Sequence, residues 1–239
     1  MRKHPSPLHG LLHNFQINPN KVKTIDFSSV DHDWTPGFRT LCAGTRQDGI
    51  DMDAVDTAPI QIYTDGSGND GQVGAAAVLY REGHRIRSTR FLLGSEKDYM
   101  VPTAEGLVLV LALELLKEER GVGRVTITTD NVGAIARAKE DKADTAQFLW
   151  KLFQRQWMAT QKRFRIIQLV IRWVPGHEGI PGNEEADCLA KKATTHGSSR
   201  ARTLPKLLHK PMPVSRSAVR RWINSQIKAR VLDRWHKSM

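Results

Sequence analysis

The order of the apolar segments in the middle of the chain most constrains the fold. Three β-rich segments, Ile60–Thr64, Val73–Arg81 and Ile86–Leu93, follow one another with short connections, and the connection around Gly83 has hairpin length. The next segment, Ala104–Leu116, is apolar on almost every side, which is typical of a helix that is buried all round. We therefore expect three antiparallel strands followed by a buried helix.

Strands and helices alternate in the rest of this region. The order βββαβααβα predicts an α/β fold with a five-stranded mixed sheet, in which three antiparallel strands are followed by βα units and helices cover both faces. The later strands are expected at Val125–Thr129 and Ile166–Val174, and the later helices at Asn131–Lys139, Ala143–Lys162 and Pro181–Lys192.

The positive charge is concentrated at one end of the chain. The 239 residues include 36 Lys+Arg and 25 Asp+Glu, a formal net charge of +11. Residues 200–239 hold 11 Lys+Arg and one acidic residue, whereas residues 59–199 carry a net charge of +2 and residues 1–58 a net charge of −1. A basic tail predicts a nucleic-acid partner, bound through release of counterions from phosphates. The second interpretation, a helix that docks on a missing protein partner, stays open.

Composition excludes several classes of protein. Hydrophobic residues make up 40% of the chain, enough for an ordinary core, and no apolar run reaches the roughly 18–20 residues of a membrane span. The two cysteines, Cys42 and Cys188, are too few for a disulfide framework and lie too far apart for a zinc site. We expect an intracellular protein, in the nucleus or the cytoplasm, with no secretory signal and no membrane partner.

We divide the chain into three parts. Residues 1–58 contain several prolines and no sustained period, which predicts an extended leader or connector, with a turn at Asp48–Asp56. Residues 59–195 form the globular domain. Residues 196–239 form a basic linker and a C-terminal helix, in which four apolar residues fall on one side at helical spacing. These are Val219, Trp222, Ile223 and Ile227.

Four acidic residues stand where strands end or helices begin. Asp65 and Asp130 each end a predicted strand, Glu105 lies in the first turn of the buried helix, and Asp187 lies one turn into the last helix. Open α/β sheets place their sites where such ends converge. Clustered carboxylates repel one another unless cations neutralise them, and oxygen ligands suit Mg²⁺ or Mn²⁺. Two such ions can activate a water and stabilise the leaving oxygen of a phosphodiester displacement.

Taken singly, each of these acidic residues also fits a turn, a helix cap or a solvated position. Together they lie in four motifs through which about residues 59–195 resemble a type 1 ribonuclease H domain. The resemblance implies a ribonuclease H-like fold and endonucleolytic hydrolysis of the RNA strand of an RNA–DNA hybrid, with the four carboxylates holding two Mg²⁺ ions, or Mn²⁺. The motifs are YTDGS at Tyr63–Ser67, TAE at Thr103–Glu105, TTDN at Thr128–Asn131 and WVPGHEGIPGNEEAD at Trp173–Asp187.

Five further residues are candidates for the site. His177 lies in the glycine-flanked loop PGHEG, and the matching histidine of the family is assigned to proton transfer or product departure, which suits an imidazole. Gly66 is expected to let backbone amides approach a ribose 2′-hydroxyl, and Ser67 follows it in the same motif. Asn131 is expected to reach the minor groove of a hybrid. Asn183 is expected to cap the last helix or to contact nucleic acid.

Only 46 residues separate Asp130 from His177, and this interval holds no dense basic loop. In this respect the domain resembles the retroelement type of ribonuclease H. The leader and the tail resemble the flanks of that domain in fungal non-LTR retrotransposons, which implies a reverse transcriptase domain in a longer polyprotein. Two alternatives to hybrid hydrolysis stay open: a catalytically silent fragment that only binds nucleic acid, and a related two-metal nuclease or integrase.

Overall fold

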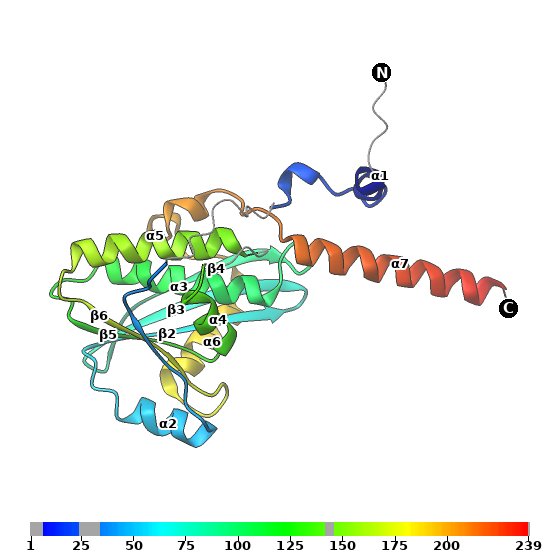
Figure 1. Cartoon of the computed structure of the whole chain (residues 1–239). Coiled ribbons are helices and arrows are strands. Elements are labelled where there is room, and N and C mark those ends of the chain that lie inside the picture. Colours follow the sequence, from blue (N-terminus) through cyan, green and yellow to red (C-terminus); the bar gives the residue numbers. More distant parts are fainter. Residues whose placement is uncertain (1–6, 24–33, 142–145, 239) are drawn as a thin grey trace.

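A computed structural model describes residues 7–23, 34–141 and 146–238 of the chain. Its centre is a six-stranded sheet with the strand order β1-β6-β5-β2-β3-β4, and helices cover both faces (Figure 1). The N-terminal elements are α1 (Pro7–Asn14), a 3₁₀ helix at Pro19–Lys21, β1 (Arg39–Leu41) and α2 (Arg46–Ala54). The central elements are β2 (Ile60–Asn69), β3 (Gln72–Arg81), β4 (His84–Ser95), α3 (Val101–Lys117), β5 (Arg124–Thr129), α4 (Val132–Ala138), α5 (Gln147–Arg163), β6 (Gln168–Trp173) and α6 (Pro181–His196). Two 3₁₀ helices, Ala201–Thr203 and Lys206–His209, lead to α7 (Arg216–Ser238).

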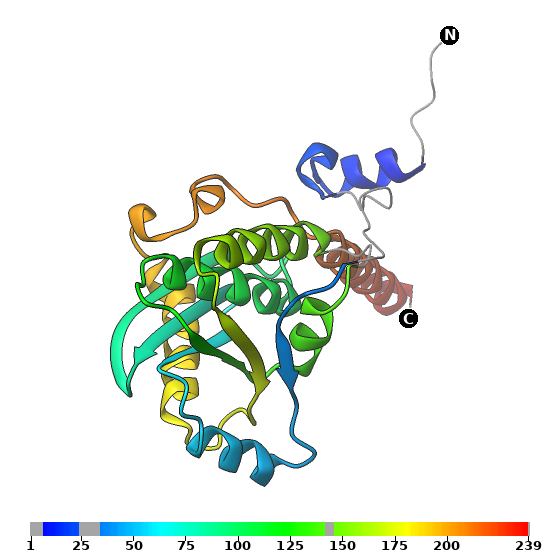
Figure 2. The same cartoon turned by 60° about the vertical axis from the view of Figure 1, so that its left-hand side comes forward.

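The predicted α/β fold with a mixed sheet and helices on both faces is confirmed, and the expected order of elements from Ile60 onward is the observed one. The sheet has six strands where five were expected. The additional strand, β1, runs parallel to β6, with Arg39 opposite Val170 and Leu41 opposite Arg172. A strand of three residues has no measurable sequence period, so only its pairing with β6 defines it. Figure 2 shows β1 beside β6 at the edge of the sheet.

The N-terminal segment differs from the expected extended leader. The acidic stretch that predicted a turn forms most of α2 instead. Its N-cap is Thr45, whose side chain accepts a hydrogen bond from the backbone N–H of Asp48 at 3.1 Å, and Asp48 in the first turn interacts favourably with the helix dipole. Residues 34–58 therefore contribute a strand and a capped helix to the body of the protein.

The strand β2 runs five residues beyond its predicted end. Antiparallel pairing with β3 continues through Asp65 to Asn69, whereas parallel pairing with β5 stops at the pair Thr64–Thr129. Asp65 therefore lies inside a strand and not at its end. The predicted alignment of the two acids still holds with respect to β5, because Asp65 and Asp130 both come directly after the last β2–β5 pair.

The main core lies between the sheet and α3, which α5 covers on its other side. As expected for a helix apolar on all sides, α3 is buried from Thr103 to Leu113. The opposite face of the sheet packs on α6, and Ile50 of α2 joins the small cluster between them. Among the described residues no helix combines the length and the apolar character needed to cross a membrane.

The basic tail begins as part of the body. Leu204, Leu208 and Met212 join the main core, and the backbone carbonyl of Met212 accepts a hydrogen bond from the Tyr99 hydroxyl at 2.7 Å. The segment that was expected to be a linker therefore covers one end of the domain, and α7 starts from a fixed point.

The buried side chains of α7 lie in its first turns, and further along Arg230 lies over the ring of Phe15, 4.8 Å from its centroid. Ala218 and Val219 are buried, and Trp222 makes an edge-to-face contact with Phe15 of the N-terminal segment, with ring centroids 5.7 Å apart. From Ile227 to Lys237 every side chain is exposed. Figures 1 and 2 show this part of α7 projecting away from the domain.

Candidate active site

Three of the predicted carboxylates meet at one point of the sheet. Asp65 on β2, Glu105 on α3 and Asp130 after β5 each place a carboxylate oxygen within 4.8 Å of the other two. Asp65 and Glu105 are each only 6% exposed, and Asp130 is partly exposed. The site is therefore a largely buried group of three acidic side chains with one side toward solvent.

Gly66 brings two of these elements together. A Cβ atom at this position would lie 3.0 Å from the Cβ of Ala104 and 3.0 Å from the backbone nitrogen of Glu105, so a larger residue would push α3 away from β2. The backbone N–H of Gly66 also donates to the Asp65 carboxylate. Gly66 thus has a structural role in assembling the site. The contacts of Gly66 and Ser67 with nucleic acid stay predictions.

Burial and mutual repulsion raise the pKa values of these acids. Burial, with repulsion from Asp130 and Asp187, raises the pKa of Asp65 to about 7. Burial, with repulsion from Asp65 and Asp130, raises the pKa of Glu105 to about 8. Burial also raises the pKa of Asp130, although the nearby His177 opposes the shift. The ionised cluster is electrostatically unfavourable on its own.

The donor set fits a divalent cation. All three groups offer carboxylate oxygens, the ligands that Mg²⁺ and Mn²⁺ prefer. Oε2 of Glu105 is buried and has no hydrogen-bond partner among the described residues. A buried acceptor without a donor is costly, and a bound cation would satisfy it while relieving the repulsion within the cluster.

Asp187, the fourth predicted ligand, belongs to a second group. It lies on α6 close enough to raise the pKa of Asp65 and Asp130, but its carboxylate groups with His177 and Glu184, one ligand atom of each within 4.8 Å of the others. Its Oδ2 accepts a hydrogen bond from Lys191 Nζ at 2.7 Å. The expected tetrad is therefore a buried group of three with Asp187 beside it.

Glu184 was not among the site residues expected from the sequence. Its spacing in the sequence did point to the site, because Glu184 precedes Asp187 by three residues in a helix and thus shares its face. Helical spacing alone does not separate a site residue from a solvated acid, and only the fold brings His177 to the same point.

His177 lies in an exposed loop between β6 and α6. Its backbone adopts the left-handed region, with φ of 58°, which is uncommon for a residue other than glycine. The preceding Gly176 lies against the cluster, because a Cβ there would be 2.6 Å from Oδ2 of Asp130. The loop thus presents His177 at the solvent side of the carboxylates.

The two asparagines occupy different environments. Asn131 caps α4, since its Oδ1 accepts from the backbone N–H of Ala134 at 2.9 Å, and its side chain also hydrogen-bonds to Glu105. Asn183 does not cap α6: the N-cap is Ile180, and Asn183 lies within the first turn, only 2% exposed. The capping interpretation was therefore wrong by three residues. Contact of either asparagine with nucleic acid stays a prediction.

The sheet order, the buried helix and the carboxylate cluster define an α/β domain of the ribonuclease H type. The family model described as RNase H matches residues 57–195. Ribonuclease H of Nitrosococcus oceani is 31% identical over 153 residues, which cover 60% of this chain and 99% of that protein. Ribonuclease H of Maricaulis maris is 32% identical over 151 residues, 59% of this chain and 97% of that protein. The structure of LC11-RNase H1, isolated from compost, has 25% identity and a TM-score of 0.45 over 59% of this chain and 98% of that chain.

The chain belongs to the RNase H family. It is accordingly a nuclease of the hydrolase class, and its carboxylate cluster is compatible with the divalent metal that the family uses.

Proposed function

We propose that this chain hydrolyses the RNA strand of RNA–DNA hybrids endonucleolytically, with two divalent cations, Mg²⁺ or Mn²⁺. The observation that carries the proposal is the buried group of Asp65, Glu105 and Asp130, whose oxygens converge within 4.8 Å in a chain of this family. The raised pKa values of Asp65 and Glu105 support a cation-binding role, because a cluster so unfavourable when ionised has no evident structural purpose.

Each side chain has a proposed role. Asp65, Glu105 and Asp130 hold the cations, and Asp187 joins them when it releases Lys191. Divalent cations held by these residues would supply an activated water and stabilisation of the leaving oxygen. His177, at the solvent side, moves a proton to the departing group. The hybrid contacts this edge through Gly66, Ser67, Asn131 and Asn183.

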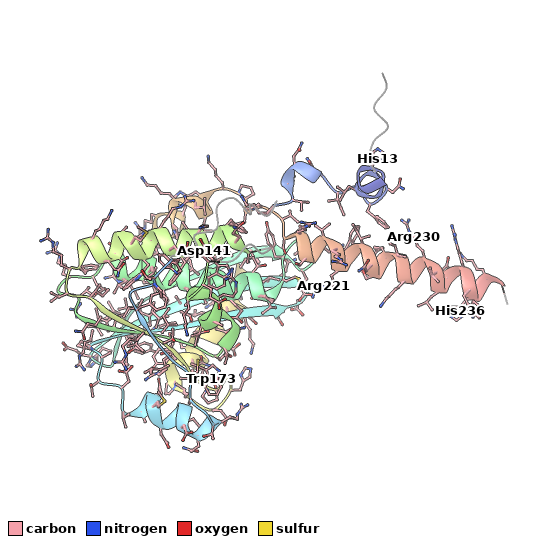
Figure 3. All side chains as sticks on the ribbon, viewed as in Figure 1. His13, Asp141, Trp173, Arg221, Arg230 and His236 are labelled. Carbon is pink, nitrogen blue, oxygen red and sulfur yellow. The ribbon has the colours of Figure 1, made fainter. Side chains whose placement is uncertain are left out.

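We propose that α7 provides the electrostatic contacts with the phosphate backbone of the hybrid. The domain is nearly neutral, whereas α7 contains seven Lys and Arg residues and a single acidic residue, Asp233. Its outer half is exposed, and Figure 3 shows Arg230 and His236 out along the projecting helix. Exposed cations that replace counterions on phosphates provide affinity without base specificity.

The alternative partner for α7 is a protein. Ile227, Val231, Leu232 and Trp235 are between 42% and 63% exposed, and an apolar stripe of this kind also suits docking on a neighbouring domain. That neighbour would be a reverse transcriptase domain if the chain is of the retroelement type. The support for this type is the short interval between Asp130 and His177, without a dense basic loop, together with the basic tail.

A cleavage assay on an end-labelled RNA–DNA hybrid, with and without Mg²⁺, tests the proposal. We expect cuts in the RNA strand only, dependent on the cation, and none in duplex DNA or duplex RNA. Hybrid binding without cleavage would favour the silent fragment. Cleavage of duplex DNA would favour the related nuclease or integrase.

A further inference from the structure

The helix α2 lies on the loop that carries His177, although α2 precedes the residues that the family model matches. Gly49 of α2 is buried, and a Cβ there would lie 2.8 Å from Cδ of Pro175 and 3.1 Å from Cζ3 of Trp173. The helix backbone therefore rests directly on the side chains of Pro175 in the loop and of Trp173, the last residue of β6. Trp173 is labelled in Figure 3, where α2 lies next to it.

Arg46, the first residue of α2, hydrogen-bonds to the residues on both sides of His177. Its Nε donates to Oε1 of Glu178 at 2.7 Å, and its Nη2 donates to the backbone carbonyl of Gly176 at 3.1 Å. A planar guanidinium can satisfy two acceptors in a fixed geometry, which an ammonium group cannot. The residues on both sides of His177 are thus held by one side chain.

The other side of the same loop faces the carboxylates. Gly176 contacts the side chain of Asp130, and the indole Nε1 of Trp173 donates to the backbone carbonyl of Asp130 at 3.0 Å. The loop is therefore packed between the cluster and α2. A shift of α2 would change how far His177 lies from Asp130.

The C-terminal end of α2 is fixed to the sheet. Arg172 of β6 is buried, pairs with Asp53 at 2.5 Å and Asp56 at 3.2 Å, and donates to the carbonyl of Met52 at 2.8 Å. The hydroxyl of Tyr63 donates to Asp53 at 3.0 Å. A buried arginine whose two terminal nitrogens both bind partners on this segment anchors the end of α2, so α2 can hold the loop.

We infer that Arg46 is a positioning residue for His177. The left-handed backbone of His177 is sparsely populated, and such conformations persist only where the surroundings hold them. Arg46 and the Gly49 contact provide that support from a segment outside the family region. The kinetic part of the inference rests on the proposed function, because His177 acts only if the chain cleaves the hybrid.

A loss of activity on replacing Arg46 could also come from the loss of a direct contact between Arg46 and a phosphate. Replacing Glu178 distinguishes this explanation from loop positioning. Replacing Arg46 removes a positive charge and replacing Glu178 removes a negative one, so the two changes have opposite electrostatic effects on hybrid affinity. They have the same effect on the position of the loop. Gln47→Ala is the matched control, because Gln47 contacts only its helix neighbour Asp51, at 2.8 Å, among the hydrogen bonds of the described chain.

The kinetic test compares Arg46→Ala and Glu178→Ala in the full chain, with and without His177→Ala. Each change is expected to lower kcat by roughly three- to tenfold and to leave KM within about twofold, since misplacement of a loop group affects the chemical step. In the His177→Ala background neither should lower kcat further. Arg46→Lys should recover part of the loss. Additive losses, or KM values that move in opposite directions, would overturn the inference.

Hydrogen exchange of the loop amides provides a measurement that does not depend on activity. Arg46→Ala should speed exchange at residues 176–179, and Gln47→Ala should leave it unchanged. Unchanged exchange in Arg46→Ala overturns the inference whether or not the protein cleaves. Faster exchange in a protein that cleaves no hybrid overturns the proposed function alone and supports the hold of Arg46 on the loop.

Discussion

The charged side chains of the carboxylate cluster are largely buried and fixed, whereas those of the outer half of α7 are exposed. Asp65 and Glu105 are 6% exposed and held by the pairing of β2 and the packing of α3. The basic residues of α7 beyond Gln226 are exposed and lie on a helix whose buried side chains are in its first turns. Charges in a buried site interact strongly and shift one another's pKa, whereas exposed charges are screened by salt. The first arrangement suits chemistry at fixed distances, and the second suits capture of a polyanion.

The largest expected effect is on the cluster. Asp65→Asn should lower the rate of hybrid cleavage by more than about a hundredfold, because it removes a central electrostatic group while keeping the shape of the side chain. The rate is measured in single turnover with saturating protein and Mg²⁺. Asp70→Asn on the exposed β2–β3 turn is the matched control and should cleave normally. Near-normal cleavage by Asp65→Asn would refute the assignment of the cluster.

The second largest expected effect distinguishes the role of His177 from that of the carboxylate ligands. His177→Ala should lower kcat by about ten- to a hundredfold, at or below the low end for proton transfer by a positioned side chain. Cation binding, measured by titration calorimetry, should change little, because the buried group of three remains complete. A large loss of cation affinity in this variant would make His177 a ligand and not a proton-transfer residue.

The third prediction concerns α7. Replacing Lys228 and Arg234 by glutamine should weaken hybrid binding several-fold at moderate salt, and each lost phosphate contact should flatten the slope of log affinity against log salt by ~0.7–0.9. The single-turnover rate at saturation should not change. The matched control replaces Ile227 and Val231 by serine.

Loss of binding in the serine variant alone, with the salt slope intact, would show that α7 docks through its apolar residues. A deletion should start after Gln226, because Ala218 and Val219 in the first turns of α7 are buried and Trp222 contacts Phe15. Removing residues from 200 onward would take away Leu204, Leu208 and Met212 and thereby unfold part of the body.

The smallest expected effect is on the free energy of unfolding and its dependence on pH. In the folded protein the pKa of Asp65 is about 7 and that of Glu105 about 8, well above the values of exposed carboxyl groups. Between about pH 4 and pH 8 the folded state therefore binds more protons than the unfolded state, so the free energy of unfolding falls as pH rises. With a chelator present, Asp65→Asn should melt about 2–4 °C above the wild type at pH 8, with a difference that shrinks as pH falls and vanishes near pH 4.

Calorimetric melting curves at several pH values check this prediction. Mg²⁺ should raise the melting temperature of the wild type more than that of Asp65→Asn, because ligands stabilise the state that binds them. A difference that grows toward low pH would mean that Asp65 is stabilised, not destabilised, when ionised.

Much of the fold was predictable because its signals are local. The strand periods, the hairpin turn and the apolar helix around Leu109 depend on neighbours within a few residues, and they yielded the order of elements from Ile60 to His196. Asp65, Glu105 and Asp130 were correctly expected to meet, because successive strand ends in such a sheet converge. The capping role of Asn183 was wrong because a shift of three residues in the helix start changes a cap into an interior position.

What the sequence determined by itself was the family, the mixed sheet and the identity of the acidic residues, since motif spacing and periodicity are properties of short segments. The tertiary structure decided the rest. It made residues 39–54 a strand and a helix through pairing with β6 and the buried Arg172, it placed Asp187 beside the other three acids in a group with His177 and Glu184, and it placed Arg46 against the loop of His177. These features depend on contacts between residues up to about 130 positions apart, which no local pattern encodes.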